Sequence, residues 1–252
     1  MLRFCNLSYG PESSDLVKNL SYDVPSGAPC LILGSNGSGK STLARMLAGD
    51  IVPHEGCALL DGADLMAMSK RERARAVGFV AQDRDDGVVP FSVFDYACLG
   101  WYPYVPLFAS PDAGMREITK QILEELGLGD KLDADARMLS GGEFRLLSLA
   151  RALSGDRKLL ILDEADAALD FRNRAFFWER IRKLCADGMI VLAVTHDAAA
   201  LCEPRASCIV LAREHEPLCG RVAEVLNEET IRKYLGVRSR NGFGVQRVFE
   251  PA

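Results

Sequence analysis

The sequence predicts an α/β fold built on a parallel β-sheet, and three short apolar runs carry that prediction. Residues 30–33, 159–162 and 189–194 are apolar throughout, as expected of strands that are buried on both faces. The first run ends at a glycine-rich loop, the second at two carboxylates, and the third at Thr195-His196-Asp197. Because ligands of open parallel sheets bind at the carboxyl ends of the strands, we expect these polar residues to share one edge.

Helical spacing and capping residues predict the elements between and after these strands. Residues 40–49 predict a helix that ends at Gly49, and residues 69–75 predict a helix before a strand over 76–82. Further helices are expected over 92–100, 114–128 and 140–153, and from a capped start at Asn227. We expect buried faces on the helices over 114–128 (Ile118, Ile122, Leu123, Leu126) and 140–153 (Leu146, Leu147, Leu149, Ala150, Leu153).

Composition excludes several classes of protein. The chain has 252 residues and a net charge of −5, which disfavours binding to nucleic acid. The first ten residues show no secretory signal, and no run approaches the roughly eighteen apolar residues of a membrane span. The eight cysteines are scattered without a CxxC pair. We therefore expect a cytoplasmic protein with reduced, mostly buried thiols.

The strongest single signal is a phosphate-binding loop between the first apolar run and its helix. The sequence 34–41 fits G-x-x-x-x-G-K-[ST] at every fixed position, with Lys40 expected at the outer phosphates and Ser41 on Mg²⁺. A glycine-rich turn with a surface lysine is the alternative, but the flanking strand and helix favour a nucleoside triphosphate site. The expected nucleotide-binding residues are Gly34, Ser35, Asn36, Gly37, Ser38, Gly39, Lys40, Ser41 and Thr42.

Two carboxylates follow the second apolar run and complete a candidate catalytic set. Asp163 is expected to hold Mg²⁺, directly or through water, and Glu164 to polarise the attacking water. His196 and Gln82 also follow strands, and we expect His196 near the γ-phosphate and Gln82 on the metal or the water. Each alone has a plain alternative, an acidic loop or a structural histidine, and only their combination with the phosphate loop favours catalysis.

The segment Ser140-Gly141-Gly142-Glu143 precedes the helix over 140–153. It fits a capping box, S-x-x-E, which is its simplest explanation. Two glycines in the first turn nevertheless cost roughly 1 kcal/mol each relative to alanine. Such a cost suggests that a group such as a phosphate approaches the backbone closely.

These motifs, in this order, make the chain similar to the ATP-binding-cassette (ABC) ATPases over residues 1–240. The motifs are GSNGSGKST, a glutamine at 82, LSGGE, LLILDE, an ALD loop at 168–170 and a histidine at 196. The resemblance implies a P-loop NTPase (RecA-like) core with an N-terminal antiparallel β part and an inserted helical subdomain. We expect the core over about 1–88 and 157–252 and the helical subdomain over about 89–156.

The resemblance also implies an ATP hydrolase that works as a head-to-tail dimer. Residues 140–143 of one copy would then cap the γ-phosphate held by the other, and Asp170 would lie in the loop that joins the two sites. Tyr9 matches the aromatic residue that stacks on adenine, with a core tyrosine in a hairpin as its alternative. The implied cofactors are ATP and Mg²⁺.

Three departures from the family pattern remove no catalytic group. Ala165 and Asp166 follow the catalytic glutamate, where a proline and a small hydroxyl residue are usual. We expect Asp166 to add negative charge near the phosphates. Glu143 replaces the commoner glutamine, and Phe144-Arg145 replaces a basic residue and a glutamine.

The segment VPFSVFDYACLGWYPYVPLF, residues 89–108, is similar to ATPases that power uptake of iron–siderophores, haem and cobalamin. The resemblance implies integral membrane permease subunits, a substrate-binding protein and a position on the inner face of the membrane. Residues 101–104 have two alternatives, core packing or docking to the permease. A soluble ABC ATPase of iron–sulfur cluster assembly, or an importer ATPase for molybdate or tungstate, remains the alternative function.

Overall fold

The computed structural model describes residues 1–10, 16–82, 90–167, 169–195, 198–201, 203–213, 215–235, 237–241 and 247–251. Its centre is a six-stranded sheet in the order β10-β9-β3-β8-β7-β6, in which β10 alone is antiparallel to its neighbour. The strands are β3 (Cys30–Gly34), β6 (Val77–Val80), β7 (Leu159–Asp163), β8 (Ile190–Val194), β9 (Ser207–Ala212) and β10 (His215–Arg221). The predicted parallel sheet is therefore confirmed.

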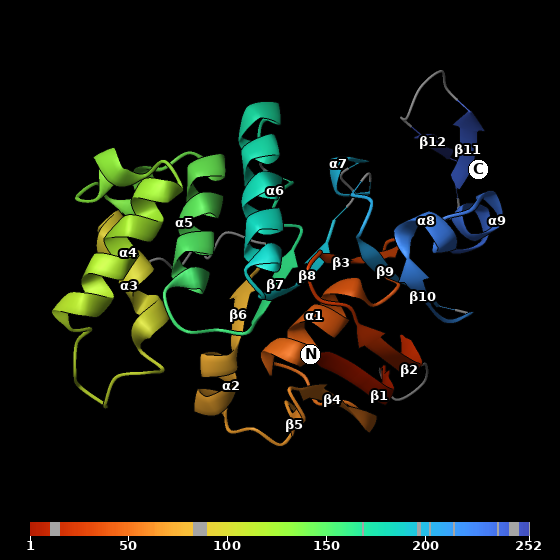
Figure 1. The fold of residues 1–252 in the computed structure, drawn as a ribbon, viewed down its shortest axis with the longest axis horizontal. Coiled ribbons are helices and arrows are strands. Elements are labelled where there is room, and N and C mark those ends of the chain that lie inside the picture. The colour runs from red at the N-terminus through yellow and green to blue at the C-terminus, as the bar shows by residue number, and fades with distance from the viewer. Residues whose placement is uncertain are drawn as a thin grey trace.

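An antiparallel sheet in the order β2-β1-β4-β5 covers one side of the molecule (Figure 1). Its strands are β1 (Leu2–Tyr9), β2 (Val17–Val24), β4 (Glu55–Leu60) and β5 (Ala63–Asp64). Helix α1 (Lys40–Ala48) buries Leu43, Met46 and Leu47 in a core that this sheet shares with one face of the six-stranded sheet. The helix ends at Gly49, whose φ of +102° favours glycine, as the sequence predicts.

The other face of the six-stranded sheet is covered by helices. The core on this face holds buried residues of α3 (Val93–Cys98), α4 (Ala113–Glu125), α5 (Gly141–Leu153), α6 (Phe171–Ala186) and α7 (Ala198–Leu201), with single turns η1 (Leu99–Trp101), η2 (Gly129–Lys131) and η3 (Ala136–Met138). Helix α2 (Lys70–Ala76) lies instead on the side of α1, where Ala76 packs against the core that contains α1. Alternate residues of each buried strand serve the two cores: Leu160 and Leu162 face α5 and α6, whereas Leu159 and Ile161 face α1. Figure 1 shows α3, α4 and α5 gathered at one end of the molecule.

The C-terminal part adds α8 (Val222–Val225), α9 (Glu228–Thr230), the π-helical turn η4 (Ile231–Leu235) and a hairpin of β11 (Val237–Asn241) and β12 (Arg247–Pro251). Asn227 caps α9 by accepting a hydrogen bond from Thr230 N at 2.9 Å, as predicted. Strands β9 and β10 and the last hairpin are not among the elements predicted from the sequence. The division into a core and a helical subdomain at about 89–156 stays a prediction.

In the helical part, the structure corrects the predicted burial of Ile118 and decides between the two alternatives for Trp101. Ile118 is 46% exposed rather than buried, and Thr119 takes the inward position on α4. Trp101 is 8% exposed and donates from Nε1 to Thr119 Oγ1 at 2.8 Å. The burial of Trp101 supports the core-packing alternative for that residue.

The seven described cysteines are free thiols, and Cys30, Cys98, Cys185 and Cys208 are buried. Burial raises the pKa of Cys30, Cys185 and Cys208 to about 12. Within the described ranges, no helix is both long enough and apolar enough to cross a membrane.

Candidate functional site

The glycine-rich loop lies between the end of β3 and the start of α1. A Cβ atom on Gly34 would lie 2.4 Å from both Leu211 O and Ser38 Oγ, so this position has room only for glycine. Gly37 and Gly39 have φ values of +74° and +98°, in the left-handed region that glycine adopts without strain. Among the described residues no side chain caps the start of α1, which leaves its first N–H groups directed at the loop. These features suit a bound phosphate.

Lys40 is almost fully buried at the base of this loop. Its Nζ donates to Gly34 O and to Ser35 O, at 3.0 Å each. Burial lowers the pKa of Lys40, and the carboxylates of Glu164 and Asp163 offset part of that effect. The Ser38 hydroxyl is also buried and has no hydrogen-bond partner among the described residues. A phosphate oxygen would satisfy both the ammonium and the hydroxyl, so the loop fits a nucleotide.

The remaining loop residues divide between the exposed tip and the helix. Ser35, Asn36 and Gly37 are exposed, whereas Ser41 and Thr42 lie partly buried in the first turn of α1. Arg213, just past the end of β9, donates from Nε to Gly37 O at 3.0 Å. Arg213 was missed from the sequence, because nothing in its local pattern links it to a loop 176 residues earlier.

Asp163, the last residue of β7, faces the start of α1. Ser41 Oγ donates to Asp163 Oδ1 at 3.0 Å, and Asp163 is 3% exposed. Burial raises the pKa of Asp163. A hydroxyl and a carboxylate oxygen at this spacing are the oxygen ligands that Mg²⁺ prefers, so the donor set fits the ion.

Glu164 follows Asp163 in a left-handed conformation with φ of +49°, and its N–H donates to Val194 O at 3.0 Å. Gln82 Nε2 donates to Glu164 Oε2 at 2.8 Å. The structure thus brings together two of the predicted catalytic residues from segments 82 residues apart. His196 and Ala168 lie outside the described residues.

Asp166 makes hydrogen bonds that the sequence did not predict. Its carboxylate accepts hydrogen bonds from Thr195 Oγ1 at 2.6 Å and from Trp178 Nε1 at 3.3 Å, and the residue is 5% exposed. It therefore joins the loop after β7 to the end of β8 and to α6. This network gives the departure from the family pattern a structural role.

Tyr9 lies at the end of β1, partly buried and in edge contact with the ring of His54 at a centroid distance of 5.5 Å. Its carbonyl accepts a hydrogen bond from Leu16 N at 2.8 Å. A Cβ atom on Gly39 would touch Leu16 Cβ at 3.1 Å, so this strand end approaches the phosphate loop. Stacking of Tyr9 on adenine stays a prediction.

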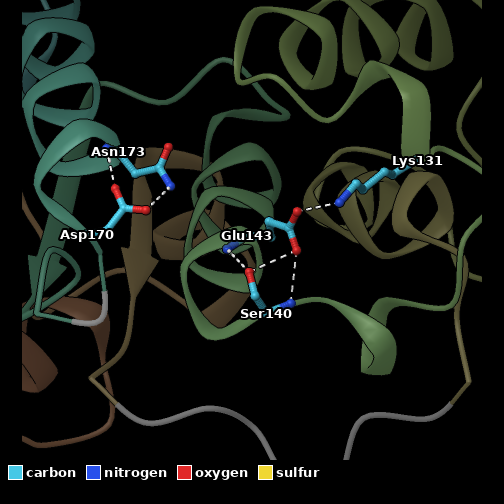
Figure 2. Close-up of polar contacts among 5 residues, drawn as sticks. All are labelled: Lys131, Ser140, Glu143, Asp170 and Asn173. Carbon is cyan, nitrogen blue, oxygen red and sulfur yellow. Dashed lines mark hydrogen bonds and ion pairs between the residues drawn. The ribbon is translucent and has the colours of Figure 1, made fainter.

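The segment 140–143 forms the N-terminus of α5 as a capping box (Figure 2). Ser140 N and Ser140 Oγ donate to Glu143 Oε2 at 2.9 and 2.8 Å, and Glu143 N donates back to Ser140 Oγ at 3.3 Å. Lys131 Nζ donates to the other carboxylate oxygen, Oε1. Gly141 is exposed and Gly142 partly buried in the first turn. Lys131, twelve residues before its partner, was missed from the sequence.

Asp170 caps the start of α6 through its carboxylate (Figure 2). Its carboxylate accepts hydrogen bonds from Asn173 N at 2.8 Å and from Asn173 Nδ2 at 3.1 Å. Arg145 donates to Ala81 O, which joins α5 to the segment that carries Gln82. Asp170 and Ser140 therefore both stand at helix N-termini.

Comparison with known proteins agrees with this geometry. A family model described as ABC transporter matches residues 17–167. A probable metal transport system ATP-binding protein of Thermotoga maritima is 31% identical, over 90% of this chain and 87% of that protein. A Nod factor export ATP-binding protein of Rhizobium is 38% identical, over 75% of this chain and 61% of that protein. A solved metal-chelate type ABC transporter, in an inward-facing conformation, shares the fold at a TM-score of 0.84 and 24% identity, covering 100% and 96% of the two chains.

The predicted P-loop NTPase fold is thus confirmed, with its antiparallel β part and helical part. The chain belongs to the ABC transporter family as an ATP-binding protein, and members of that family bind and hydrolyse ATP.

Proposed function

We propose that this chain is the ATP-hydrolysing subunit that energises an importer of metal chelates. The observation that carries the hydrolysis step is the Ser41–Asp163 hydrogen bond beside the Gln82–Glu164 hydrogen bond. These two contacts bring the phosphate loop and the carboxylates to one edge of the sheet, as hydrolysis of a terminal phosphate requires.

Within one copy, each site residue has a distinct task. Lys40 is placed to neutralise charge on the outer phosphates, and the N–H groups at the start of α1 are placed to bind phosphate oxygens. Ser41, Asp163 and Gln82 would hold Mg²⁺, which supplies positive charge to the phosphate oxygens. Glu164 accepts the proton of the attacking water, and Gln82 orients that carboxylate. His196 is proposed beside the γ-phosphate.

The second half of the site is proposed to come from another copy of the chain, arranged head to tail. Ser140, Gly141 and Gly142 stand at the start of α5, where backbone N–H groups and the hydroxyl favour an incoming phosphate. Met138 and Phe171 flank Ser140 and Asp170 and are 82% and 90% exposed. Large apolar side chains so exposed favour burial against a partner surface.

The permease is proposed to dock beside the segment that follows Trp101. Tyr102, Leu107 and Phe108 are 52%, 80% and 99% exposed, so the aromatic stretch continues into an exposed apolar segment. Docking there would place the chain on the inner face of the membrane, next to integral permease subunits that receive substrate from a binding protein.

The cargo class is proposed from two similarities. Residues 89–108 resemble uptake ATPases for iron–siderophores, haem and cobalamin, and the Thermotoga relative is named for metal transport. The Rhizobium relative is named for export, so the direction of transport needs its own test. Import of molybdate or tungstate, or a role in iron–sulfur cluster assembly, is the alternative.

The test is co-purification of this chain with its permease, followed by ATPase assays of the complex in vesicles. We expect a ferric siderophore, haem or cobalamin, delivered with its binding protein, to raise ATP turnover, and molybdate to leave it unchanged. The Glu164→Gln variant should bind ATP and hydrolyse it at least about 100-fold more slowly. Stimulation by molybdate alone would contradict the cargo, and unchanged turnover in Glu164→Gln would contradict the catalytic role of Glu164.

A further inference from the structure

Glu143 lies between two partners that use different oxygens of its carboxylate (Figure 2). Oε2 accepts both donors of Ser140, whereas Oε1 accepts the Lys131 ammonium. The two side chains of the ion pair are 35% and 30% exposed, so water screens the pair only in part. The ion pair therefore belongs to the same contact network as the Ser140 hydroxyl.

The backbone holds Lys131 in place for this contact. Lys131 N donates to Leu128 O at 3.1 Å, and Lys131 O accepts from Ala134 N at 2.9 Å. The same turn is bound to the start of α3, because Phe94 N donates to Leu132 O at 3.0 Å. Lys131 is thus a cation on a fixed turn and not a freely moving surface charge.

The hydrogen bond from Lys131 lowers the pKa of Glu143 to about 2, and the hydrogen bonds from Ser140 act in the same direction. Removing Lys131 would leave the Ser140 bonds, which also favour the ionised form. Glu143 would then carry an uncompensated negative charge at the start of α5. A phosphate approaching Ser140 would meet that charge, which repels it.

We propose that Lys131 is a positioning residue of the 140–143 segment: it cancels the charge of Glu143 so that Ser140 can approach the terminal phosphate of an ATP held by a second copy of the chain. This inference rests on the head-to-tail arrangement proposed above. It also explains how this chain accommodates glutamate at 143, where the commoner residue is an uncharged glutamine.

The experiment measures the ATP concentration for half-maximal dimerisation, by light scattering, in a full-length Glu164→Gln parent that retains bound ATP. We expect Lys131→Met to raise that concentration by roughly tenfold at low ionic strength, because an unpaired charge faces the phosphate. In a Glu143→Gln background the same Lys131→Met change should have less than about a twofold effect, since no charge remains to be cancelled. Lys131→Arg should behave as the parent.

Lys120→Met is the matched control, because it removes a lysine from an exposed pair with Glu124 on α4. A thermal midpoint without ATP reports folding of each variant. The inference is overturned if Lys131→Met dimerises like the parent, or if its effect is the same with glutamate and glutamine at 143. In either case a parent that dimerises with ATP leaves the head-to-tail proposal standing. If the parent stays monomeric with ATP, the head-to-tail proposal fails and the role of Lys131 falls with it.

Discussion

Gln82 and Glu164 are joined by a 2.8 Å hydrogen bond in which the amide Nε2 donates to the carboxylate Oε2. The backbone of Glu164 is fixed independently, by its left-handed conformation and by the hydrogen bond from its N–H to Val194 O. The amide of Gln82 therefore restricts the rotation of the Glu164 side chain. A carboxylate that is to accept a proton from water needs such restriction.

Replacing Gln82 with alanine tests this relationship. We expect kcat for ATP hydrolysis to fall by roughly tenfold to 100-fold, because Glu164 loses the donor that orients it. KM for ATP should change less than kcat, since the glycine-rich loop is untouched and two proposed ligands of Mg²⁺, Ser41 and Asp163, remain. Gln121→Ala removes an exposed glutamine from α4 and is the control. A change in KM without a change in kcat would contradict an orienting role for Gln82.

Asp163 should show a conflict between stability and function. Burial raises its pKa above the ordinary value of 3.8, so folding favours the protonated form and disfavours the ionised form. The contribution of the protonated Asp163 carboxyl group to folding stability is complete below pH 3.8, and it is lost as pH rises through the folded-state pKa. An asparagine side chain does not titrate, so the Asp163→Asn variant should gain stability relative to wild type as pH rises.

Urea unfolding without nucleotide or metal measures this difference, repeated from about pH 4, the ordinary pKa of a carboxylate, up to about pH 7. Asp50→Asn is the control, because it removes a carboxylate from the exposed surface, where Asp50 pairs with Arg45 at 3.5 Å. In the presence of Mg²⁺ the Asp163→Asn variant should lose ATP hydrolysis by at least about 100-fold, since it lacks a carboxylate for the ion. Equal pH dependence in Asp163→Asn and wild type would contradict the assignment of the burial cost to Asp163.

The phosphate loop could be predicted from sequence because its determinants are local. Gly39, Lys40 and Gly49 each act within one strand–loop–helix unit, and the structure confirms that unit. The carboxylates after β7 were equally accessible, since the apolar run of a buried strand stops where the strand ends. Helix α5 followed from its own periodicity, with Leu147 and Leu149 fully buried.

Contacts between distant segments could not be predicted in this way. On α4 the hydrophobic pattern favours Ile118 in the core, yet Thr119 is the buried residue. Its hydroxyl accepts a hydrogen bond from the Trp101 indole and donates one to Met115 O at 3.0 Å. Lys131 and Arg213 contact the site from segments whose own sequences carry no motif. Strand β9 carries a signal in its own sequence, the apolar run at 208–211, although it is not among the predicted elements.

Asp166 links the two strand ends that carry the catalytic set, and its removal should destabilise the fold. Asp166→Ala takes away the acceptor of the Thr195 and Trp178 hydrogen bonds in a buried site. We expect the free energy of unfolding to fall by about 1–3 kcal/mol, measured by urea denaturation. In a Thr195→Val background the loss should be smaller, because the Thr195 donor is already absent. Fully additive losses would show that the Asp166–Thr195 bond contributes nothing to stability.

The segment 101–108 should separate into a part that stabilises the fold and a part that binds the permease. Trp101→Ala removes a buried ring and its hydrogen bond to Thr119, and should lower the free energy of unfolding by about 3–5 kcal/mol. Phe108 is 99% exposed at a φ of +67°, a conformation that asparagine tolerates well. Phe108→Asn should therefore leave the unfolding free energy within about 0.5 kcal/mol of wild type.

Among correctly folded variants, Phe108→Asn should weaken assembly with the permease more than Trp101→Ala does. Because Phe108 is proposed to bury its ring against the permease, Phe108→Asn should weaken co-purification by about tenfold or more while basal ATP hydrolysis persists. Val52→Ser is the matched control, since Val52 is 77% exposed on a different part of the chain. Undiminished co-purification of Phe108→Asn, at an unchanged unfolding free energy, would move the docking surface away from residues 107–108. A loss shared by Val52→Ser would show that any exposed apolar residue has the same effect.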